Sequence, residues 1–178
     1  FGTFRWIRGI ETLIMSLSNN LVKKGVDVSI LSACPTKNKF TFELDSRVKV
    51  KHFPTFHYFE YQTIVPFYAM DLIKNKYDIV NIFFADYGEN ISIKLASQFN
   101  DFYLNLYITY SLEATRHRFE AFKRYGLVDR ADSIISDCEY VASGAEQFFK
   151  RPSVVIPIGS DPELFKPNAI ARNQIRHR

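Results

Sequence analysis

The sequence predicts an α/β fold: a Rossmann-like, open, mostly parallel sheet with helices on both faces. Segments typical of strands alternate with segments typical of helices about six times along the chain, which is the pattern of parallel strands joined by crossover helices. Residues 77–85 form a nearly continuous apolar run, as expected of a strand that is buried on both faces.

Length and composition agree with this fold class. The chain has 178 residues, of which 47% are hydrophobic and 24% charged, so it can bury the core of one domain. The only cysteines, Cys34 and Cys138, form neither a disulfide framework nor a metal pattern, which predicts a reducing, cytoplasmic compartment. No apolar run approaches the roughly 18 residues of a membrane span.

The first helix has the clearest period. Its expected core stripe is spaced three and four residues apart and consists of Ile10, Leu13, Ile14, Leu17, Leu21 and Val22. Lys23 and Lys24 suit the C-terminal end of this helix, and Gly25 suits the left-handed position that follows it. A helix at the start of such a fold should follow a strand, so we expect the first strand to lie before Phe1.

The remaining elements follow from periodicity and turn residues. Strands are predicted at residues 26–33, 47–53, 102–110, 132–136 and 153–157, and helices at 66–76, 88–99, 113–131 and 138–149. The alternating pattern of 47–53 indicates a half-exposed strand. Ser136 and Glu139 match a capping box for the last helix, and Gly159 is expected in a conformation that other residues avoid.

Ligands of open α/β sheets bind at the carboxyl ends of the strands. The loops expected at this edge are 5–9, 34–39, 85–90, 111–117, 136–139 and 157–161. Arg8 and Gly9 begin the first helix, whose N-terminal N–H groups attract phosphate and whose glycine permits a close approach. The alternative is an ordinary tight turn, since neither a dinucleotide-binding glycine motif nor a phosphate-binding P-loop is present.

Two of these loops contain candidates for chemistry. Ser111 and Glu113 follow a strand and are weak catalytic candidates, because a carboxylate there could exchange a proton with, or bind, an acceptor hydroxyl. Arg116 and His117 lie further along the same helix. They are predicted to bind the acceptor, although a capped helix start with solvated charges would look the same.

Residues 85–90 supply two further acceptor-binding candidates, Asp86 and Tyr87. Residues 48–61 mix basic and aromatic side chains, which is typical of base-stacking platforms and membrane-interface patches. A strand and loop whose aromatic side chains cover the core would give the same pattern. His52 and His57 lack partners at metal-ligand spacing, so no metal site is predicted.

Taken together, these residues resemble the N-terminal domain of GT-B glycosyltransferases of family four, over residues 8–167. Four segments carry the resemblance in the family's order: "IRGIETLIMSLSNNLVKKGVDVSILSA", "YDIVNIFF", "ADSIISDCEYVASGAEQF" and "VVIPIGSDPELFKP". The sequence departs from the family pattern at five positions. Arg8 replaces a glycine, Ile158 replaces an asparagine, and three residues each replace a histidine: Val26, Asn81 and Ser111.

The resemblance implies a retaining, metal-independent transfer of a sugar from a nucleotide-sugar donor to an acceptor hydroxyl, without another cofactor. Residues 1–167 would form the acceptor-binding domain, with Arg8 and Gly9 facing the donor phosphates. Residues 168–178 would begin an interdomain segment that leads to a donor-binding domain outside this chain, so the chain alone should be inactive.

The implied acceptor is a sugar, a lipid-linked molecule or a protein, and we expect no nucleic-acid partner. The basic charge of +4 leaves peripheral contact with an acidic membrane open. Two other interpretations remain: a non-catalytic Rossmann-like binding module, favoured by Asn81 and Ser111, and a nucleic-acid binder, suggested by residues 48–61.

Overall fold

The computed structural model describes residues 9–33, 44–53, 64–83 and 87–159. Their strands form two parallel sheets. The smaller sheet pairs β1 (Ser29–Ala33) with β2 (Lys49–Phe53). The larger sheet has the order β3 (Ile79–Ile82), β4 (Tyr103–Ile108), β5 (Ser133–Ser136), β6 (Val154–Val155), and every pairing is parallel. The predicted parallel α/β class is confirmed.

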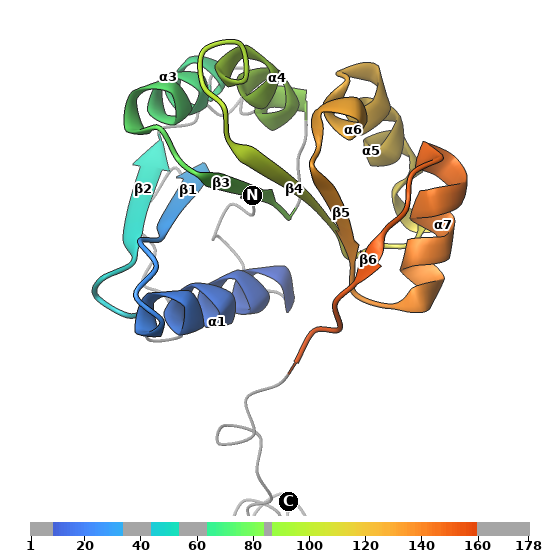
Figure 1. Ribbon diagram of the computed structural model, residues 1–178, viewed down its shortest axis with the longest axis horizontal. Coiled ribbons are helices and arrows are strands. Elements are labelled where there is room, and N and C mark those ends of the chain that lie inside the picture. The colour runs from blue at the N-terminus through green and yellow to red at the C-terminus, as the bar shows by residue number, and fades with distance from the viewer. Residues whose placement is uncertain (1–8, 34–43, 54–63, 84–86, 160–178) are drawn as a thin grey trace, which may run out of the picture.

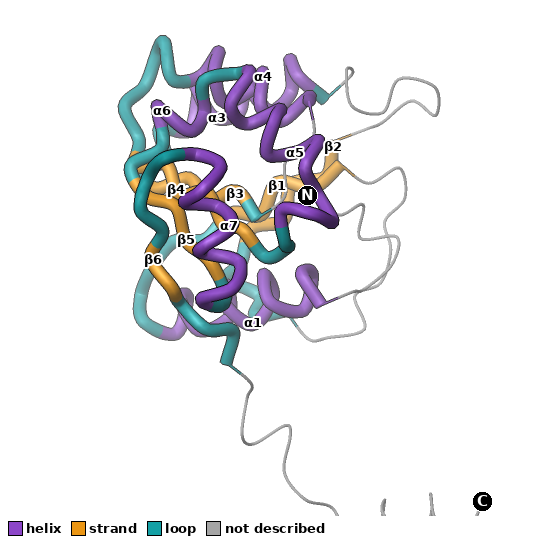
Figure 2. Tube along the Cα trace, turned by 90° about the vertical axis from the view of Figure 1, so that its right-hand side faces the viewer, coloured by secondary structure: helices purple, strands orange, loops and turns teal. Residues whose placement is uncertain are grey.

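Helices lie on both sides of the strand layer. They are α1 (Gly9–Lys23), α3 (Val65–Asn75), α4 (Tyr87–Ala96), α5 (Leu112–Arg124), α6 (Leu127–Arg130) and α7 (Glu139–Phe149). Figure 1 shows α1 on one side of the strands and α3 and α4 on the other, and the perpendicular view in Figure 2 agrees. This confirms that helices flank both faces.

The main core lies between the larger sheet and α3 to α7. On β4, Leu104, Leu106 and Ile108 are buried and point to this side. The rings of Phe119 in α5 and Phe149 in α7 stack with their centroids 4.9 Å apart. Because residues of five helices join one buried cluster, these helices share one face of the sheet.

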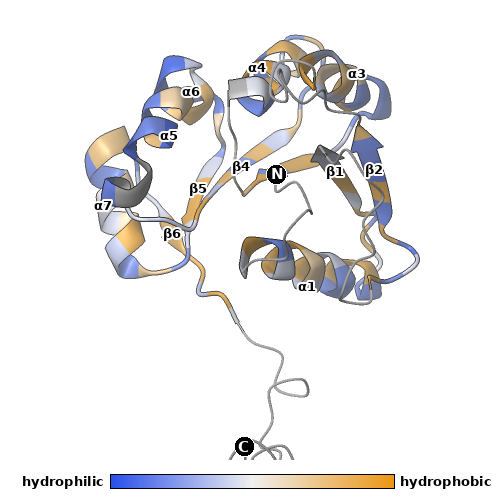
Figure 3. Cartoon of the chain, turned by 180° about the vertical axis from the view of Figure 1, so that it is seen from behind, coloured by the Kyte–Doolittle hydropathy of each residue, from blue (hydrophilic) through white to orange (hydrophobic). Residues whose placement is uncertain are grey.

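The contacts of α1 form a separate, smaller core. Met15 and Val22 are buried against Ile30 of β1 and Val48. The predicted stripe is only partly correct: Val22 is buried, whereas the other five members, Ile10, Leu13, Ile14, Leu17 and Leu21, are half-buried. Figure 3 shows hydrophobic residues on the side of α1 that faces the strands. The helix therefore carries more apolar surface than the described residues cover.

The start of α3 packs on the other side of the smaller sheet. Ile64 and Tyr68 form a buried cluster with Leu31 of β1 and Phe53 of β2. The Phe53 and Tyr68 rings meet edge to face at 5.2 Å. Phe53 thus covers the core, as the structural alternative for residues 48–61 expects. The aromatic residues at 54–63 lie outside the described residues.

The prediction that residues 77–85 are buried on both faces is wrong. Ile79 is 57% exposed, Asn81 is also exposed, and only Ile82 of β3 is buried. The register partner of Ile79 is Tyr103, which is 48% exposed. One face of β3 packs under the helices, whereas no described element buries these residues on the other face.

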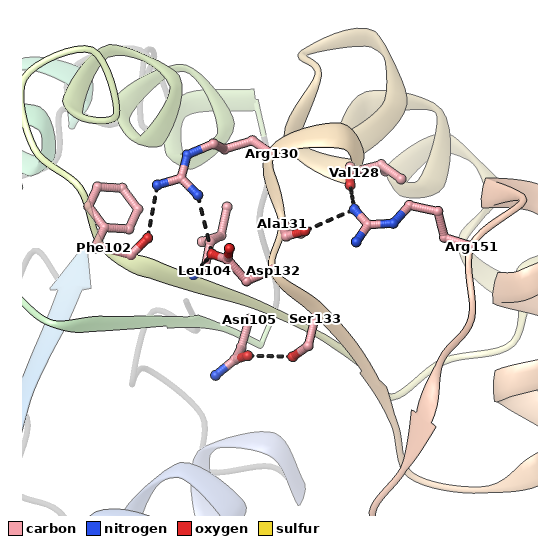
Figure 4. A network of polar contacts seen from close by, with 9 residues as sticks. All are labelled: Phe102, Leu104, Asn105, Val128, Arg130, Ala131, Asp132, Ser133 and Arg151. Carbon is pink, nitrogen blue, oxygen red and sulfur yellow. Dashed lines mark hydrogen bonds and ion pairs between the residues drawn. The ribbon is translucent and has the colours of Figure 1, made fainter.

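A row of polar side chains crosses this second face. The amide of Asn105 in β4 donates to Asn81 Oδ1 in β3 at 2.8 Å. The hydroxyl of Ser133 in β5 donates to Asn105 Oδ1 (Figure 4). These residues are also register partners along the sheet. The row therefore marks one level across three adjacent strands.

The amino ends of β4 and β5 are joined through Arg130 and Asp132, which form an ion pair with each other in the loop before β5. Asp132 Oδ2 accepts the N–H of Leu104 at 2.7 Å and lies 3.2 Å from Arg130 Nη1. Arg130 Nη2 also donates to the carbonyl of Phe102 at 2.8 Å (Figure 4). These contacts fix the loop before β5 to the start of β4.

The helix predicted at 113–131 is divided in two. Gly126, at the break between α5 and α6, has a φ of 70°, a left-handed conformation that ends a helix. Arg151 donates to the carbonyls of Val128 and Ala131 beyond the break (Figure 4), so the short second helix is held separately. Gly25 has the predicted positive φ, at 84°.

Two local predictions are wrong. Ser136 is not an N-cap, because the cap residue of α7 is Cys138, which makes no side-chain cap hydrogen bond. Ser136 instead ends β5, and its hydroxyl lies 2.7 Å from that of Ser153. Gly159 does not adopt a positive φ. The chain after β6 therefore makes no left-handed turn at this residue.

Candidate functional site

The carboxyl ends of β4 and β5 bring two of the predicted loops to the same edge. Ile108 and Ser136 are register partners at these ends. Helix α5 begins at Leu112, a few residues after β4, and α7 begins at Glu139, shortly after β5. Because the strands are parallel, the first turns of both helices lie at one edge of the sheet.

Glu113 and Tyr140 connect these two helix starts. The Tyr140 hydroxyl donates to Glu113 Oε2 at 3.1 Å. The pKa of the Glu113 carboxyl is lowered, first by its own backbone N–H and then by the hydroxyls of Tyr140 and Ser111. The same contact raises the pKa of Tyr140. The result is an exposed carboxylate that stays ionised and is held by two hydroxyl groups.

The Glu113 carboxylate is placed to bind hydroxyl groups. An ionised carboxylate accepts hydrogen bonds, and at a sheet edge it can orient a hydroxyl-bearing molecule. Ser111 and Glu113, both predicted as site residues, are brought together here. Tyr140 was not predicted, because its contact with Glu113 joins residues that lie 27 positions apart.

The other α5 candidates are placed differently. Arg116 Nε lies 3.3 Å from Glu120 Oε1, one turn further along the same helix, and both side chains are well exposed. His117 is exposed on α5, four residues after Glu113. The structure therefore gives Arg116 a surface ion pair and leaves His117 at the solvent.

The candidates from the two other loops are only partly within the described residues. Arg8 and Asp86 lie outside them. Tyr87 is the first residue of α4, and its side chain is not described. Gly9 is the exposed first residue of α1, and among the described residues no atom beyond its chain neighbours and the backbone of its own helix lies within 4 Å of where its Cβ would be. The backbone at Gly9 is therefore open to close approach.

A second group at the carboxyl edge was missed by sequence reasoning. The Tyr107 hydroxyl donates to the carbonyl of Ile156 at 3.3 Å, and its ring lies 4.9 Å from that of Phe83. Burial, followed by the charge of Asp137, raises the pKa of Tyr107. One carboxylate oxygen of Asp137 is buried without a hydrogen-bond partner among the described residues. The only feature of the sequence that pointed to Asp137 was its position directly after a strand.

Two further findings concern the described residues alone. They contain no cluster of three or more His, Cys, Asp or Glu side chains placed to hold a metal ion. Within these same ranges, none of the helices combines the length and apolar character needed to cross a membrane.

Comparisons with known proteins give a family match and a structural match. Residues 7–164 match the model of the family described as Glycosyltransferase Family 4. The fold is similar to the crystal structure of HepE from Anabaena in complex with UDP and glucose, with a TM-score of 0.68 and 16% identity. That similarity covers 96% of this chain and 46% of HepE, so the chain spans about half the length of HepE. No curated protein matches significantly.

Proposed function

The chain belongs to Glycosyltransferase Family 4, and we propose that it is the acceptor-binding half of a retaining, metal-independent glycosyltransferase. In this proposal, a sugar passes from a nucleotide-sugar to an acceptor hydroxyl, and no separate cofactor takes part. The donor-binding half follows residues 168–178. The chain alone is inactive because the reaction requires both halves.

The contact between Glu113 and Tyr140 is the observation that carries this proposal. It places an ionised carboxylate at the edge of the sheet where ligands of such folds bind. A carboxylate held by two hydroxyls keeps one geometry, so it can orient an incoming acceptor hydroxyl. Asp86, Tyr87, Arg116 and His117 are proposed to contact other parts of the acceptor.

The proposed donor is a nucleotide-sugar bound between the two halves. HepE, which shares this fold, was crystallised with UDP and glucose. In this chain, Arg8 and the open backbone at Gly9, which begins α1, would face the donor phosphates. A helix N-terminus and a guanidinium would stabilise the departing diphosphate.

The proposed setting is the cytoplasm, with peripheral membrane contact if the acceptor is lipid-linked. Sugars and proteins are the other acceptor classes, and no nucleic acid takes part. Phe53, in the basic and aromatic segment, packs against Tyr68 of α3. Because this ring serves the core, it is not a stacking platform for bases.

A second candidate is a non-catalytic Rossmann-like binding module. One observation favours it: Asn81 is bonded to Asn105 within the sheet. A family histidine is expected at this position, and here an amide serves the fold instead.

Turnover by the longer protein that joins this chain to its proposed donor-binding half distinguishes the two candidates, and the wild type and variants below are forms of that protein. The wild type is assayed for nucleotide release with a panel of UDP-, GDP- and ADP-sugars and simple sugar, lipid and peptide acceptors. We expect turnover by the wild type and a loss of about 100-fold or more in Glu113→Gln. Asp101→Asn, an exposed carboxylate just before the amino end of β4, is the matched control and should stay within about twofold.

Other outcomes have equally clear meanings. Gly9→Val should lower turnover without unfolding the protein, because the space beside Gly9 is open. A folded wild type that binds sugars or nucleotides but releases no nucleotide from any donor would support the non-catalytic module. Equal activity of Glu113→Gln and Asp101→Asn would remove Glu113 from the mechanism.

A further inference from the structure

Two polar atoms at the carboxyl edge of the larger sheet have no described partner. They are Thr109 Oγ1, just after β4, and Asp137 Oδ1, just after β5. Both atoms are shielded from solvent, and among the described residues neither makes a hydrogen bond. A shielded polar atom without a partner destabilises a fold, so two such atoms at one edge indicate a role other than stability.

We propose that Thr109 and Asp137 form a subsite that binds two neighbouring hydroxyl groups of a sugar ring in the acceptor. The inference rests on the proposed function, because it takes the bound sugar to be part of the acceptor. It narrows the acceptor to a molecule that carries a sugar. Glu113 orients the hydroxyl that reacts, whereas Thr109 and Asp137 hold the ring.

Thr109 and Asp137 leave their strands side by side. They directly follow Ile108 and Ser136, which are register partners at the ends of β4 and β5. Burial, and then the charge of Asp137, raise the pKa of Tyr107 in β4, so the Asp137 carboxylate lies near that residue. The two unpartnered atoms therefore belong to one place at the edge of the sheet.

This place is on the face of the sheet opposite the main core. Leu106 of β4 and Ile134 of β5 are buried in the main core, under the helices. Thr109 and Asp137 each lie three positions further along the chain, so the alternation of side chains puts them on the other face. The polar row shown in Figure 4 crosses the same face. Glu113 belongs to α5, which packs on the core side, so the two carboxylates are separate groups.

The contacts of Tyr107 leave the Asp137 oxygen available to a ligand. The Tyr107 hydroxyl has one hydrogen, which it donates to the carbonyl of Ile156 at 3.3 Å. That hydrogen is therefore not offered to Asp137. Thr109 and Asp137 are half-buried as whole residues, so part of each lies at the surface. Side chains there change rotamer rapidly, which lets the shielded oxygens turn toward a ligand.

The chemistry of this pair suits the hydroxyl groups of a sugar. An ionised carboxylate only accepts hydrogen bonds, whereas a threonine hydroxyl both donates and accepts them. Hydroxyls on adjacent carbons of a sugar ring can donate to the first group and bond to the second. The rings of Phe83 and Tyr107, with centroids 4.9 Å apart, supply the apolar surface that ligand sites combine with a few polar groups.

Thr109→Val separates a binding role from a structural one. The change keeps the shape of the side chain and removes a hydroxyl that no described group satisfies. The protein without ligand should therefore melt at the same temperature or higher. Sugar binding should weaken about fivefold, since one hydrogen bond is lost. A lower melting temperature with unchanged sugar binding would show that the hydroxyl is structural and would overturn the proposal.

Ser97→Ala is the matched control for the lost hydroxyl. The Ser97 hydroxyl donates to the carbonyl of Lys94 at 3.0 Å, at the end of α4. Sugar binding should be the same in this variant and in the wild type. An equal loss of binding in Ser97→Ala and Thr109→Val would contradict a specific subsite.

Asp137→Asn tests the carboxylate. Binding of methyl glycosides of common hexoses, pentoses and N-acetylhexosamines to the longer protein is measured by NMR titration. At least one should bind the wild type, and Asp137→Asn should weaken its binding about tenfold, because a charged acceptor becomes neutral. Asp101→Asn changes an exposed carboxylate before β4 and should bind as the wild type does. Equal binding by both variants, or no binding by the folded wild type, would overturn the proposal.

Kinetics distinguish failure of this inference from failure of the proposed function. In a protein that turns over, Asp137→Asn and Thr109→Val should raise the KM for the acceptor and leave the KM for the nucleotide-sugar within about twofold. A rise in the donor KM alone would overturn the inference while the transferase stands. Glycoside binding that depends on Asp137, in a protein without turnover, would support the subsite and contradict the transferase.

Discussion

The ammonium of Lys51 lies 2.7 Å from Asp71 Oδ1 and 2.9 Å from the Tyr77 hydroxyl. The same hydroxyl donates to Asp71 Oδ2 at 2.8 Å. One cation in β2 thus binds a carboxylate in α3 and a tyrosine that precedes β3. These side chains are mostly shielded, with 29% of Lys51 and 11% of Asp71 exposed. The contact holds the smaller sheet to the larger one.

Breaking this contact should destabilise the fold. Asp71→Ala leaves a shielded ammonium without its carboxylate, so the free energy of unfolding should fall by roughly 1–3 kcal/mol. Tyr77→Phe removes only a hydroxyl and should cost about 1 kcal/mol. Urea unfolding followed by circular dichroism measures both. Glu120→Ala breaks an exposed pair and should change stability by about 0.5 kcal/mol at most; equal losses in Asp71→Ala and Glu120→Ala would contradict the prediction.

The same contact predicts a dependence on alkaline pH. Burial alone would lower the pKa of Lys51, but hydrogen bonds to Asp71 and Tyr77 outweigh it and raise this pKa. The stabilisation is therefore complete below the unfolded pKa of about 10.4. It is lost as the pH rises through the higher folded value. The stability gap between wild type and Lys51→Met should stay constant from pH 7 to 9 and shrink above that unfolded value.

The candidate site predicts a change in one titration. Tyr140→Phe removes one of the donors that lower the pKa of Glu113. The pKa of this carboxyl should rise toward 4.5, its ordinary value, but stay below it because the backbone and Ser111 still donate. NMR titration of the Glu113 side chain measures this. Tyr103→Phe, at the amino end of β4, is the control. If the pKa of Glu113 rose equally in this variant, the lowered pKa would not depend on the contact with Tyr140.

The contact between Asp45 and Arg47 predicts that the protein loses stability in acid. Its pKa is about 2, lowered first by the side chain and then by the backbone N–H of Arg47. Arg47→Ala should raise this pKa but leave it below 3.8, its ordinary value, because the backbone N–H remains. The stabilisation is present above the unfolded pKa of about 3.9 and is lost as the pH falls toward 2. Lys23→Ala should move the NMR titration much less; an equal shift would contradict this assignment.

Two glycines should respond differently to replacement by alanine. Gly126 has a φ of 70°, so Gly126→Ala should destabilise the fold by about 1–2 kcal/mol. Gly159 does not have a positive φ, and among the described residues no atom beyond its chain neighbours lies within 4 Å of its added Cβ. Gly159→Ala should therefore change stability by less than about 0.5 kcal/mol. Thermal unfolding of the two variants compares them directly, and equal melting temperatures would contradict the conformational argument.

The sequence predicts where the strands and helices of this fold lie better than it predicts how far each one is buried. Strand and helix positions depend on local periodicity, and the segments predicted as β4 and α7 are confirmed. The exposure of Ile79 depends instead on what lies beside β3, which periodicity does not report. The break at Gly126 escaped prediction because helix-compatible apolar and charged residues continue on both sides of it.

The candidate site was predictable only in part. Ser111 and Glu113 follow a strand, so the rule for strand ends locates them. Tyr140 belongs to another helix, and only the pairing of β4 with β5 brings it to Glu113. Asp137 was equally hidden, because the burial of one of its oxygens depends on tertiary packing.

The polar row of Asn81, Asn105 and Ser133 has a consequence for folding. Parallel strands of apolar residues can pair in shifted alignments of similar energy. A shift of one residue turns every side chain to the opposite face, which would put the Asn105 amide beneath the helices in place of Leu104 or Leu106. That misaligned sheet would bury an amide separated from its partners. The three residues thus destabilise shifted alignments and favour a single register of the strands.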